Sequence, residues 1–159
     1  MASCPVMLLL PTEIVSGVWI SNLQCALDKG DWKRVDVGGM VSLLSNDPRA
    51  ALCKVWGDPL PFEHLYFKIR DDNVQRFDRD FLDDVCTLID ECRSLQKHVV
   101  VHCRAGVSRS AACVMYYLVK SGTHRDSAEA LEYMQTKRLV DPSAALVLQM
   151  QELDELAIE

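Results

Sequence analysis

The sequence predicts an α/β protein in which helices flank a central, mostly parallel β-sheet. Short apolar stretches typical of strands alternate along the chain with amphipathic stretches of helical period. Residues 99–101 are three consecutive valines, and such a β-branched run suits a strand covered on both faces. The following stretch, 111–119, is too apolar for a surface helix. This strand and this helix are therefore predicted to lie at the centre of the fold.

The length and composition of the chain limit its organisation and its ligands. With 159 residues, the chain is predicted to form a single domain spanning residues 1–159 with a substantial core. The net charge of −6 argues against a nucleic-acid ligand, because phosphate backbones require clustered basic residues. The seven cysteines include no Cys-x-x-Cys pair, which argues against a disulfide framework and a zinc site. We therefore expect reduced thiols, no bound metal and a cytoplasmic protein, with the nucleus as a second location.

The first half of the chain is predicted to supply short strands and short helices. The apolar stretch Val6–Leu10 follows no basic residue and ends at Pro11, so it predicts neither a signal peptide nor membrane insertion. Residues 45–62 are rich in proline and charge and are expected to be mostly loop, with one helical turn at 49–54. The other expected elements are one or two strands within 13–21, a helix capped by Ser21 or Asn22 and running to Leu27, a short helix capped by Asp31 and broken by Gly38-Gly39, a buried strand at 40–44 and a strand at 64–69.

The second half is predicted to supply longer helices. The expected elements are a helix capped by Asp78 with one acidic face, the strand at 99–101, the helix at 110–120, a helix from Asp126 to Lys137, and a last helix after 141–143 with Leu146, Met150 and Leu153 on one face. The acidic turn 70–73 follows the strand at 64–69. In open α/β sheets, functional sites are built from loops at the carboxyl ends of strands. We therefore expect this turn to meet the loop that follows residues 99–101.

That loop carries a cysteine and, six residues later, an arginine. The backbone N–H groups between Cys103 and Arg109 can form an anion-binding nest, and the next helix presents its positive end. The Arg109 guanidinium adds a planar fork for two oxygens, so the loop suits a tetrahedral phosphate. The same field stabilises the thiolate of Cys103 over its thiol, which predicts a nucleophile. The residues expected to bind phosphate are Arg104, Ala105, Gly106, Val107, Ser108 and Arg109.

The run His102-Cys103-Arg104-Ala105-Gly106-Val107-Ser108-Arg109-Ser110 resembles the phosphate loop of the cysteine-dependent protein phosphatases, and most closely that of the small, atypical dual-specificity branch. The resemblance implies a protein tyrosine phosphatase-like fold and no cofactor. It also implies hydrolysis of phosphotyrosine and of phosphoserine or phosphothreonine in phosphorylated protein substrates, through a phosphocysteine intermediate. In such a site Ser110 would hydrogen-bond the Cys103 sulfur, His102 would orient the loop from below, and Arg104 would point outward and favour acidic flanking residues.

The remaining catalytic group, an acid that protonates the leaving oxygen, is expected in the acidic turn. An ungapped alignment with the family from the helix segment 88–92 places this acid on Asp72, which precedes Cys103 by 31 residues. Asp71 is the alternative, and both carboxylates could instead be loop or cap residues. The predicted catalytic residues are therefore Cys103, Asp72, Arg109 and Ser110.

The last helix departs from the family pattern. In the family it is commonly entered through Pro-Asn and carries a Phe and a Gln-Leu pair, whereas this chain has Pro142-Ser143, Leu146 and Gln149-Met150. The departure concerns contacts that support the phosphate loop, not the chemistry. Two alternative functions stay open: a catalytically weak adaptor that binds phosphoproteins, and a phosphatase acting on a non-protein phosphate ester. A thiol redox protein is disfavoured by the lack of a Cys-x-x-Cys pair, and the sequence leaves the oligomeric state open.

Overall fold

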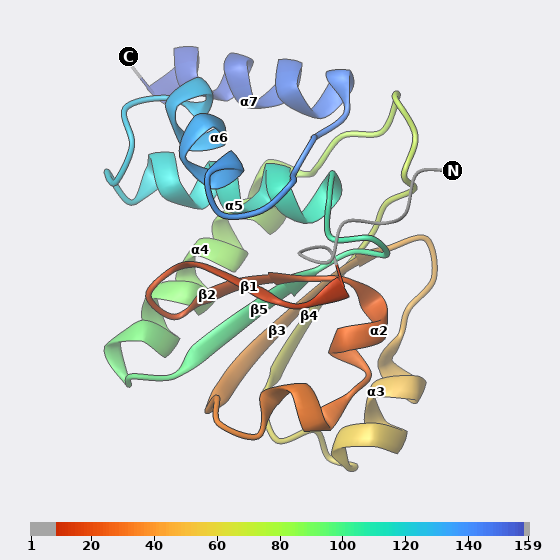
Figure 1. Cartoon of the computed structure of the whole chain (residues 1–159). Coiled ribbons are helices and arrows are strands. Elements are labelled where there is room, and N and C mark those ends of the chain that lie inside the picture. The colour runs from red at the N-terminus through yellow and green to blue at the C-terminus, as the bar shows by residue number, and fades with distance from the viewer. Residues whose placement is uncertain (1–8, 158–159) are drawn as a thin grey trace.

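Five strands form the central sheet of the computed structural model, which describes residues 9–157 (Figure 1). The strands are β1 (Thr12–Val15), β2 (Val18–Ser21), β3 (Val37–Leu44), β4 (Glu63–Lys68) and β5 (His98–His102). Their order in the sheet is β1-β2-β5-β3-β4, with β1 antiparallel to β2 and all the other neighbours parallel. The predicted α/β class with a mostly parallel sheet is therefore confirmed.

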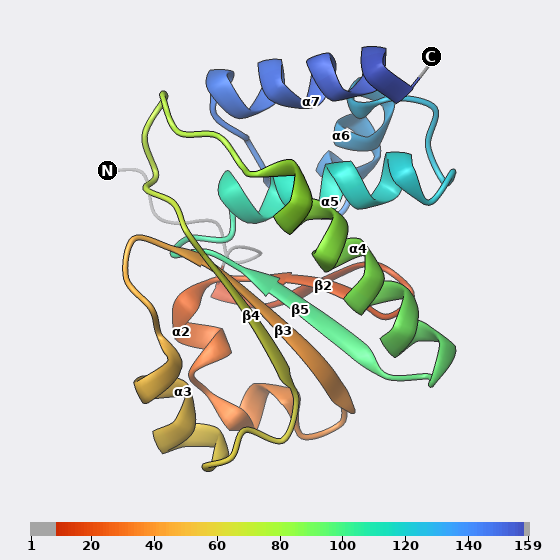
Figure 2. The same ribbon diagram turned by 180° about the vertical axis from the view of Figure 1, so that it is seen from behind.

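Helices cover both faces of this sheet (Figures 1 and 2). One face carries α4 (Arg79–Ser94) and α5 (Arg109–Lys120), and α6 (Ser127–Gln135) and α7 (Ala144–Ala157) pack against the outside of α5. The other face carries α2 (Leu23–Ala26), the 3₁₀ helix η1 (Lys29–Trp32) and α3 (Arg49–Trp56). Since α5 lies between the sheet and the last two helices, it is enclosed, as its apolar sequence predicts.

The central strand β5 shows how the sequence specifies this layering. Successive side chains of a strand point to opposite faces, and β5 lies between β2 and β3. Val99 and Val101 belong to the core shared with α4 and α5, whereas Val100 belongs to the core shared with η1 and α3. All three valines are fully buried. The valine run therefore reflects a strand covered on both faces, as expected.

Three local expectations in the first half were wrong. Asp28 caps η1 by accepting the Gly30 N–H at 3.0 Å, and Asp31 lies inside the 3₁₀ turn because the turn begins earlier than predicted. Gly38 and Gly39 belong to β3, where an added Cβ would lie 2.9 Å from the Lys97 side chain and 3.0 Å from that of Leu88. The third error is one of length: the helical turn expected at 49–54 begins at Arg49 as predicted but continues to Trp56 as the eight-residue α3.

The predicted caps of three helices are confirmed. Asn22 accepts the Cys25 N–H at 2.7 Å, Asp78 caps α4 and Asp126 caps α6. Most of the apolar stretch 6–10 lies outside the described residues. Within residues 9–157, none of the helices is long and apolar enough to cross a membrane.

Candidate active site

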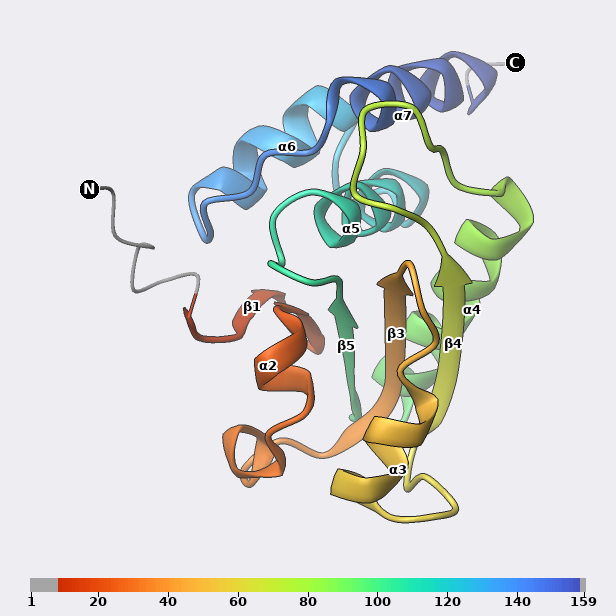
Figure 3. The same cartoon turned by 90° about the vertical axis from the view of Figure 1, so that its right-hand side faces the viewer.

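The loop that joins β5 to α5 leaves the sheet at the carboxyl end of its central strand (Figure 3). We call residues 103–109 the phosphate loop. Gly106 has a φ of +70°, in the left-handed region that favours glycine. An added Cβ would lie 2.6 Å from Arg138 Nη2 and 2.9 Å from the backbone carbonyl of Ser21. The loop can therefore close tightly only with glycine at this position.

The sulfur of Cys103 lies inside the curl of the phosphate loop, with 2% of the residue exposed. The Gly106 N–H donates to this sulfur at 3.3 Å, and Ser110 Oγ lies 3.3 Å from it. Both contacts come from groups at the start of α5 or just before it, where the helix dipole is positive. The sulfur thus faces a backbone donor and the positive end of α5, an environment that suits a nucleophile attacking an anion.

Arg109 extends from the first turn of α5 and is 3% exposed. Its Nη1 donates to the carbonyl of Ile69, at the end of β4, at 2.8 Å. Its buried Nε has no hydrogen-bond partner among the described residues. Because an unpaired buried donor is costly, an acceptor such as a phosphate oxygen would stabilise this arrangement. The side chain thus links the phosphate loop to β4 and keeps a donor for an anion.

His102 lies beneath the phosphate loop and is fully buried. Its Nε2 lies 2.6 Å from Ser42 Oγ, which in turn lies 2.9 Å from His64 Nε2. Its Nδ1 lies 3.3 Å from the carbonyl oxygen of Cys103. Burial lowers the pKa of His102 to about 4, so the ring is neutral near pH 7. The three side chains connect the phosphate loop to β3 and β4 without a buried charge.

Asp72 lies in the loop between β4 and α4, which we call the acid loop (residues 70–76). Its Oδ1 accepts the N–H groups of Val74 and Gln75, each at 2.9 Å, and its Oδ2 lies 3.3 Å from Arg70 Nε. The N–H groups of Gln75 and Val74, followed by the Arg70 charge, hold the pKa of Asp72 below its usual range. The loop in this conformation therefore favours the ionised carboxylate, and the neighbouring Asp71 is exposed.

The segment between α6 and α7 supports the phosphate loop, and no sequence pattern predicts most of this support. The fully buried Arg138 donates through Nε to the carbonyl of Gly106 at 2.8 Å. It also donates through Nη1 to the carbonyl of Leu10 at 2.7 Å and to Thr12 Oγ1 at 2.9 Å. An arginine among polar residues normally predicts a side chain in contact with water. Arg138 is buried instead because segments distant in the sequence supply its hydrogen-bond acceptors.

The unusual Pro142-Ser143 entry to α7 keeps its contact with the phosphate loop. The backbone N–H of Ser143 donates to Ser108 Oγ at 2.9 Å, and that of Asp141 donates to the Val107 carbonyl at 2.9 Å. Because the contact at residue 143 uses the backbone, it does not depend on the side chain that differs from the family pattern. The departure noted in the sequence therefore leaves these two contacts in place.

Comparison with known proteins identifies the family to which this site belongs. The family model described as "Dual specificity phosphatase, catalytic domain" matches residues 59–155, which include both loops. This chain belongs to that family. Dual specificity protein phosphatase 1 of Arabidopsis thaliana is 27% identical over 146 residues, covering 91% of this chain and 69% of that protein. Serine/threonine/tyrosine-interacting protein B of Xenopus laevis is 35% identical over 96 residues, covering 58% of this chain and 41% of that protein.

Solved structures support the same phosphatase-like fold. The human tyrosine phosphatase-like serine/threonine/tyrosine-interacting protein has a TM-score of 0.81 and 25% identity, covering 95% of this chain and 99% of that one. Human DUSP28 has a TM-score of 0.76 over 94% of this chain and 95% of that one, and at 19% identity it supports the fold alone. The expected membership of the small, atypical dual-specificity phosphatases is confirmed.

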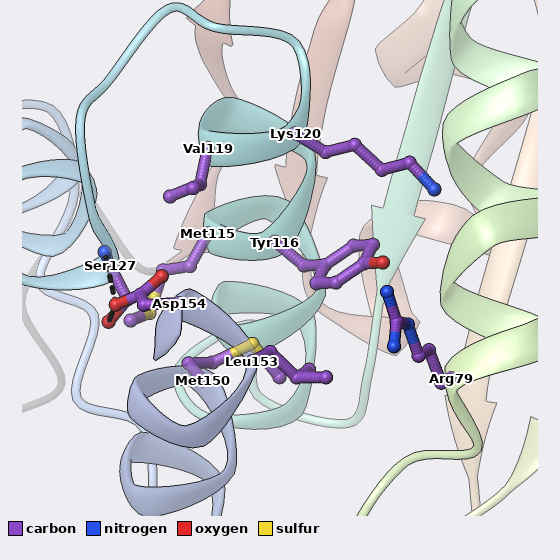
Figure 4. A pocket seen from close by; sticks show the side chains of 9 residues that line it. All are labelled: Arg79, Met115, Tyr116, Val119, Lys120, Ser127, Met150, Leu153 and Asp154. Carbon is purple, nitrogen blue, oxygen red and sulfur yellow. Dashed lines mark hydrogen bonds between the residues drawn. The ribbon is translucent and has the colours of Figure 1, made fainter. Parts of the chain in front are cut away.

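Three of the hollows in this dual-specificity phosphatase domain lie close to the phosphate loop or to the helices behind it. One of about 150 Å³ lies over the phosphate loop and is lined by Leu23, Leu44, Ser45, Asn46, Arg104 and Arg109. A neighbouring hollow of about 390 Å³ shares two lining residues with it, Leu23 and the exposed Arg104. A cavity of about 220 Å³ lies among α4, α5, α6 and α7 and contains no residue of the phosphate loop (Figure 4). Arg104 is exposed and lines the first two of these hollows, so it points outward, as the resemblance predicts.

Proposed function

We propose that this protein is a cysteine-dependent protein phosphatase that hydrolyses phosphotyrosine and phosphoserine or phosphothreonine. The observation that carries the proposal is the environment of one sulfur. Cys103 Sγ accepts the Gly106 N–H, lies 3.3 Å from Ser110 Oγ and shares its loop with a buried Arg109 whose Nε lacks a partner. A nucleophile, an anion nest and an unpaired guanidinium donor are what attack on a phosphate monoester requires.

In the first step the Cys103 thiolate attacks phosphorus in line with the leaving oxygen. The sulfur–phosphorus bond forms as the phosphorus–oxygen bond breaks, while Arg109 and the backbone N–H groups of the loop hold the three other oxygens. Protonated Asp72 gives its proton to the departing alkoxide or phenoxide. The products are the dephosphorylated side chain and a phosphocysteine on the protein.

In the second step water attacks the phosphorus of the phosphocysteine. Asp72, now a carboxylate, takes a proton from that water, and the sulfur–phosphorus bond breaks. Ser110 stabilises the thiolate that leaves, because its hydroxyl lies within 3.3 Å of the sulfur. Inorganic phosphate is released and the thiolate is regenerated, so no cofactor or redox partner enters the cycle.

The protonation of Asp72 is the demanding part of this scheme, because hydrogen bonds in the acid loop favour its carboxylate. A substrate phosphate brings negative charge toward the carboxyl group, and a neighbouring negative charge favours the protonated form. Asp72 therefore acquires its proton in the substrate complex more readily than in the free protein. Asp71 stays the alternative acid, distinguished by the substitutions described in the Discussion.

The hollow over the phosphate loop supports the proposed range of substrates. It is only about 150 Å³ in volume, which suits the short phosphoserine or phosphothreonine side chain as well as a phosphotyrosine that enters from the surface. The exposed Arg104 on its rim favours substrates with acidic residues beside the phosphorylated position. We propose phosphorylated proteins of the cytoplasm and nucleus as the substrates.

The test is release of phosphate from peptides by the purified protein. Phosphotyrosine and phosphothreonine peptides with acidic flanks are compared with neutral versions and with a phosphoinositide, and Cys103→Ser serves as the control. We expect turnover of both peptide classes, faster with acidic flanks, and little release from the phosphoinositide. Tight binding of the phosphopeptides without any release would instead identify an adaptor, and preferential release from the phosphoinositide would identify a non-protein substrate.

A further inference from the structure

The acid loop is held at its two ends by buried hydrogen bonds. At one end, the carbonyl of Ile69 accepts Arg109 Nη1 at 2.8 Å. At the other end, both backbone groups of Phe77 bond to one side chain of α7: the Phe77 N–H donates to Gln149 Oε1 at 2.9 Å, and the Phe77 carbonyl accepts Gln149 Nε2 at 2.7 Å. Ile69, Phe77 and Gln149 are all buried. The ends of the loop are therefore fixed to the phosphate loop and to α7.

Two further contacts between the acid loop and α7 are exposed. Asn73 Oδ1 accepts the Ala145 N–H at 3.1 Å, and Arg76 Nη1 lies 2.7 Å from Glu152 Oε2. The side chains of this ion pair are 39% and 50% exposed. Exposed ion pairs contribute little to the stability of the folded state, whereas a buried peptide group that loses its hydrogen-bond partner destabilises that state strongly. Gln149 therefore carries most of the attachment between the acid loop and α7.

Hydrogen bonds inside the acid loop transmit this attachment to Asp72. Asp72 accepts the N–H groups of Val74 and Gln75, and Gln75 Oε1 in turn accepts the Arg70 N–H. Residues 70–75 thus form one hydrogen-bonded unit whose placement follows the anchors at its ends. Figures 1 and 3 show this loop rising from the end of β4 to lie beside α7 before it enters α4.

The sequence of α7 places Gln149 on the side that meets the acid loop. The next residue, Met150, lines the cavity against α5 together with Leu153 (Figure 4). Consecutive helical residues differ in direction by about 100°, so Gln149 faces a neighbouring direction. A glutamine amide offers both a donor and an acceptor, which is why one side chain can satisfy both peptide groups of Phe77.

We propose that Gln149 is a positioning residue for the general acid: by fixing Phe77, it holds the acid loop so that Asp72 reaches the leaving oxygen over the phosphate loop. The inference rests on the proposed function, in which Asp72 is that acid. Gln149 does not touch the substrate. Its loss therefore weakens proton delivery while leaving the Cys103 loop and its phosphate site in place.

The test substitutes Gln149→Met, which keeps a side chain of similar length and removes both hydrogen bonds. For phosphotyrosine or an alkyl phosphate, whose leaving oxygens are basic, we expect kcat to fall about 10- to 100-fold, within the range typical of general-acid losses. For p-nitrophenyl phosphate, whose leaving group needs little protonation, we expect a loss of less than about three-fold. KM should change by less than about two-fold for both substrates, because the phosphate loop is intact.

Matched variants separate positioning from general structural damage. Gln151→Met makes the same substitution at an exposed site of the same helix, and Glu152→Gln removes the exposed ion pair from the α7 side, so both should retain wild-type kinetics. Gln149→Glu keeps the acceptor for the Phe77 N–H but loses the donor, so its loss should be intermediate. Thermal unfolding of each variant identifies a temperature at which all of them are folded, and the kinetics are compared at that temperature. If Gln149→Met does not fold, Gln149→Glu takes its place in the comparison.

Asp72→Asn measured in parallel distinguishes failure of this inference from failure of the proposed function. If Asp72→Asn shows the leaving-group dependence and Gln149→Met slows both substrates equally or neither, Gln149 does not position the acid, although Asp72 is still that acid. If Asp72→Asn keeps wild-type activity on both substrates, Asp72 is not the general acid. The proposed function and the positioning role of Gln149 then fail together. The double variant Asp72→Asn/Gln149→Met should be no slower than Asp72→Asn on the basic leaving group, and additive losses would contradict the proposal.

Discussion

The two loops that build the candidate site differ in how firmly the fold holds them. The phosphate loop is buried between the central strand and the central helix, and Cys103, Arg109 and Ser110 are each 3% exposed or less. The acid loop is largely exposed, with Val74 at 78%, and buried bonds hold it mainly at its ends. The nucleophile is thus placed by the core of the protein. The acid is placed by a few anchors, so small changes can affect it separately.

The reason for this difference lies in the chemistry of the two steps. The phosphate loop must present its N–H groups in one arrangement, and a rigid loop needs no reorganisation as charge develops. The acid must change its protonation state twice in each cycle, and an exposed carboxyl group can exchange its proton with water. The predictions below vary one loop while the other is kept, from the largest expected effect to the smallest.

The largest effect is expected for Cys103→Ser, which removes the nucleophile and leaves both loops in place. Turnover of phosphotyrosine peptides should fall by at least about 10⁴-fold, because a hydroxyl at neutral pH is a far weaker nucleophile than a thiolate. Phosphopeptide binding should persist, since the anion nest and Arg109 are unchanged. Steady-state phosphate release and calorimetric binding check both parts, and turnover close to wild type would rule out Cys103 as the nucleophile.

Arg109→Lys should be the next most damaging change, with kcat lower by about 10²- to 10³-fold. A lysine keeps the charge but loses the planar fork and the bond from Nη1 to the Ile69 carbonyl, so both loops are affected. Losses should therefore be large for basic and activated leaving groups alike. The comparison of the two substrate types checks this, and a near-normal rate would show that the charge alone is sufficient.

Asp72→Asn should weaken the proton transfers of both steps while the phosphate loop stays intact. Hydrolysis of phosphotyrosine should fall by about 10²-fold or more, and that of p-nitrophenyl phosphate much less. Because hydrogen bonds lower the pKa of Asp72, its protonated fraction in the free protein shrinks as pH rises, so kcat/KM should peak on the acidic side of neutrality. Asp72→Asn should flatten the alkaline limb of that profile and Asp71→Asn should not. The reverse pattern would make Asp71 the acid.

Arg138→Met tests the support beneath the phosphate loop. Removing the bonds to Gly106, Leu10 and Thr12 leaves the buried Gly106 carbonyl unpaired and releases two partly buried acceptors, so the free energy of unfolding should fall by about 3 kcal/mol. Among molecules that stay folded, kcat should fall about ten-fold and equally for both leaving groups, because this support does not involve the acid loop. Denaturant unfolding and paired kinetics check this. A loss selective for basic leaving groups would contradict the separation of the two loops.

A smaller effect concerns the neutral His102 beneath the phosphate loop. Burial lowers its pKa to about 4, whereas an unfolded histidine titrates near 6.5, so between these values the unfolded chain binds the extra proton. The free energy of unfolding should therefore fall as pH drops from about 6.5 to 4, by up to about 3 kcal/mol from this residue. In His102→Gln the decline over that range should be shallower, and an equally steep decline would show that other groups cause it.

Sequence patterns predicted the elements and the phosphate loop because both depend on local order. The valine run, the apolar helix at 110–120 and the spacing of Cys103 and Arg109 each lie within one continuous stretch. The support of the site depends on contacts between distant segments. Arg138 reaches Gly106, and Gln149 reaches Phe77, which is 72 residues away. A buried arginine or glutamine has no periodic signal, so only the packed structure reveals its partners.

The central claim is that phosphate passes through the sulfur of Cys103, and trapping that intermediate tests it most directly. In Asp72→Asn, the loss of the base that activates water should slow hydrolysis of the phosphocysteine. After incubation with p-nitrophenyl phosphate and acid quenching, mass spectrometry should find one phosphoryl group on the peptide that carries Cys103. It should be absent in Cys103→Ser/Asp72→Asn. Turnover with the phosphoryl group on another residue, or an adduct that survives the loss of Cys103, would contradict the mechanism.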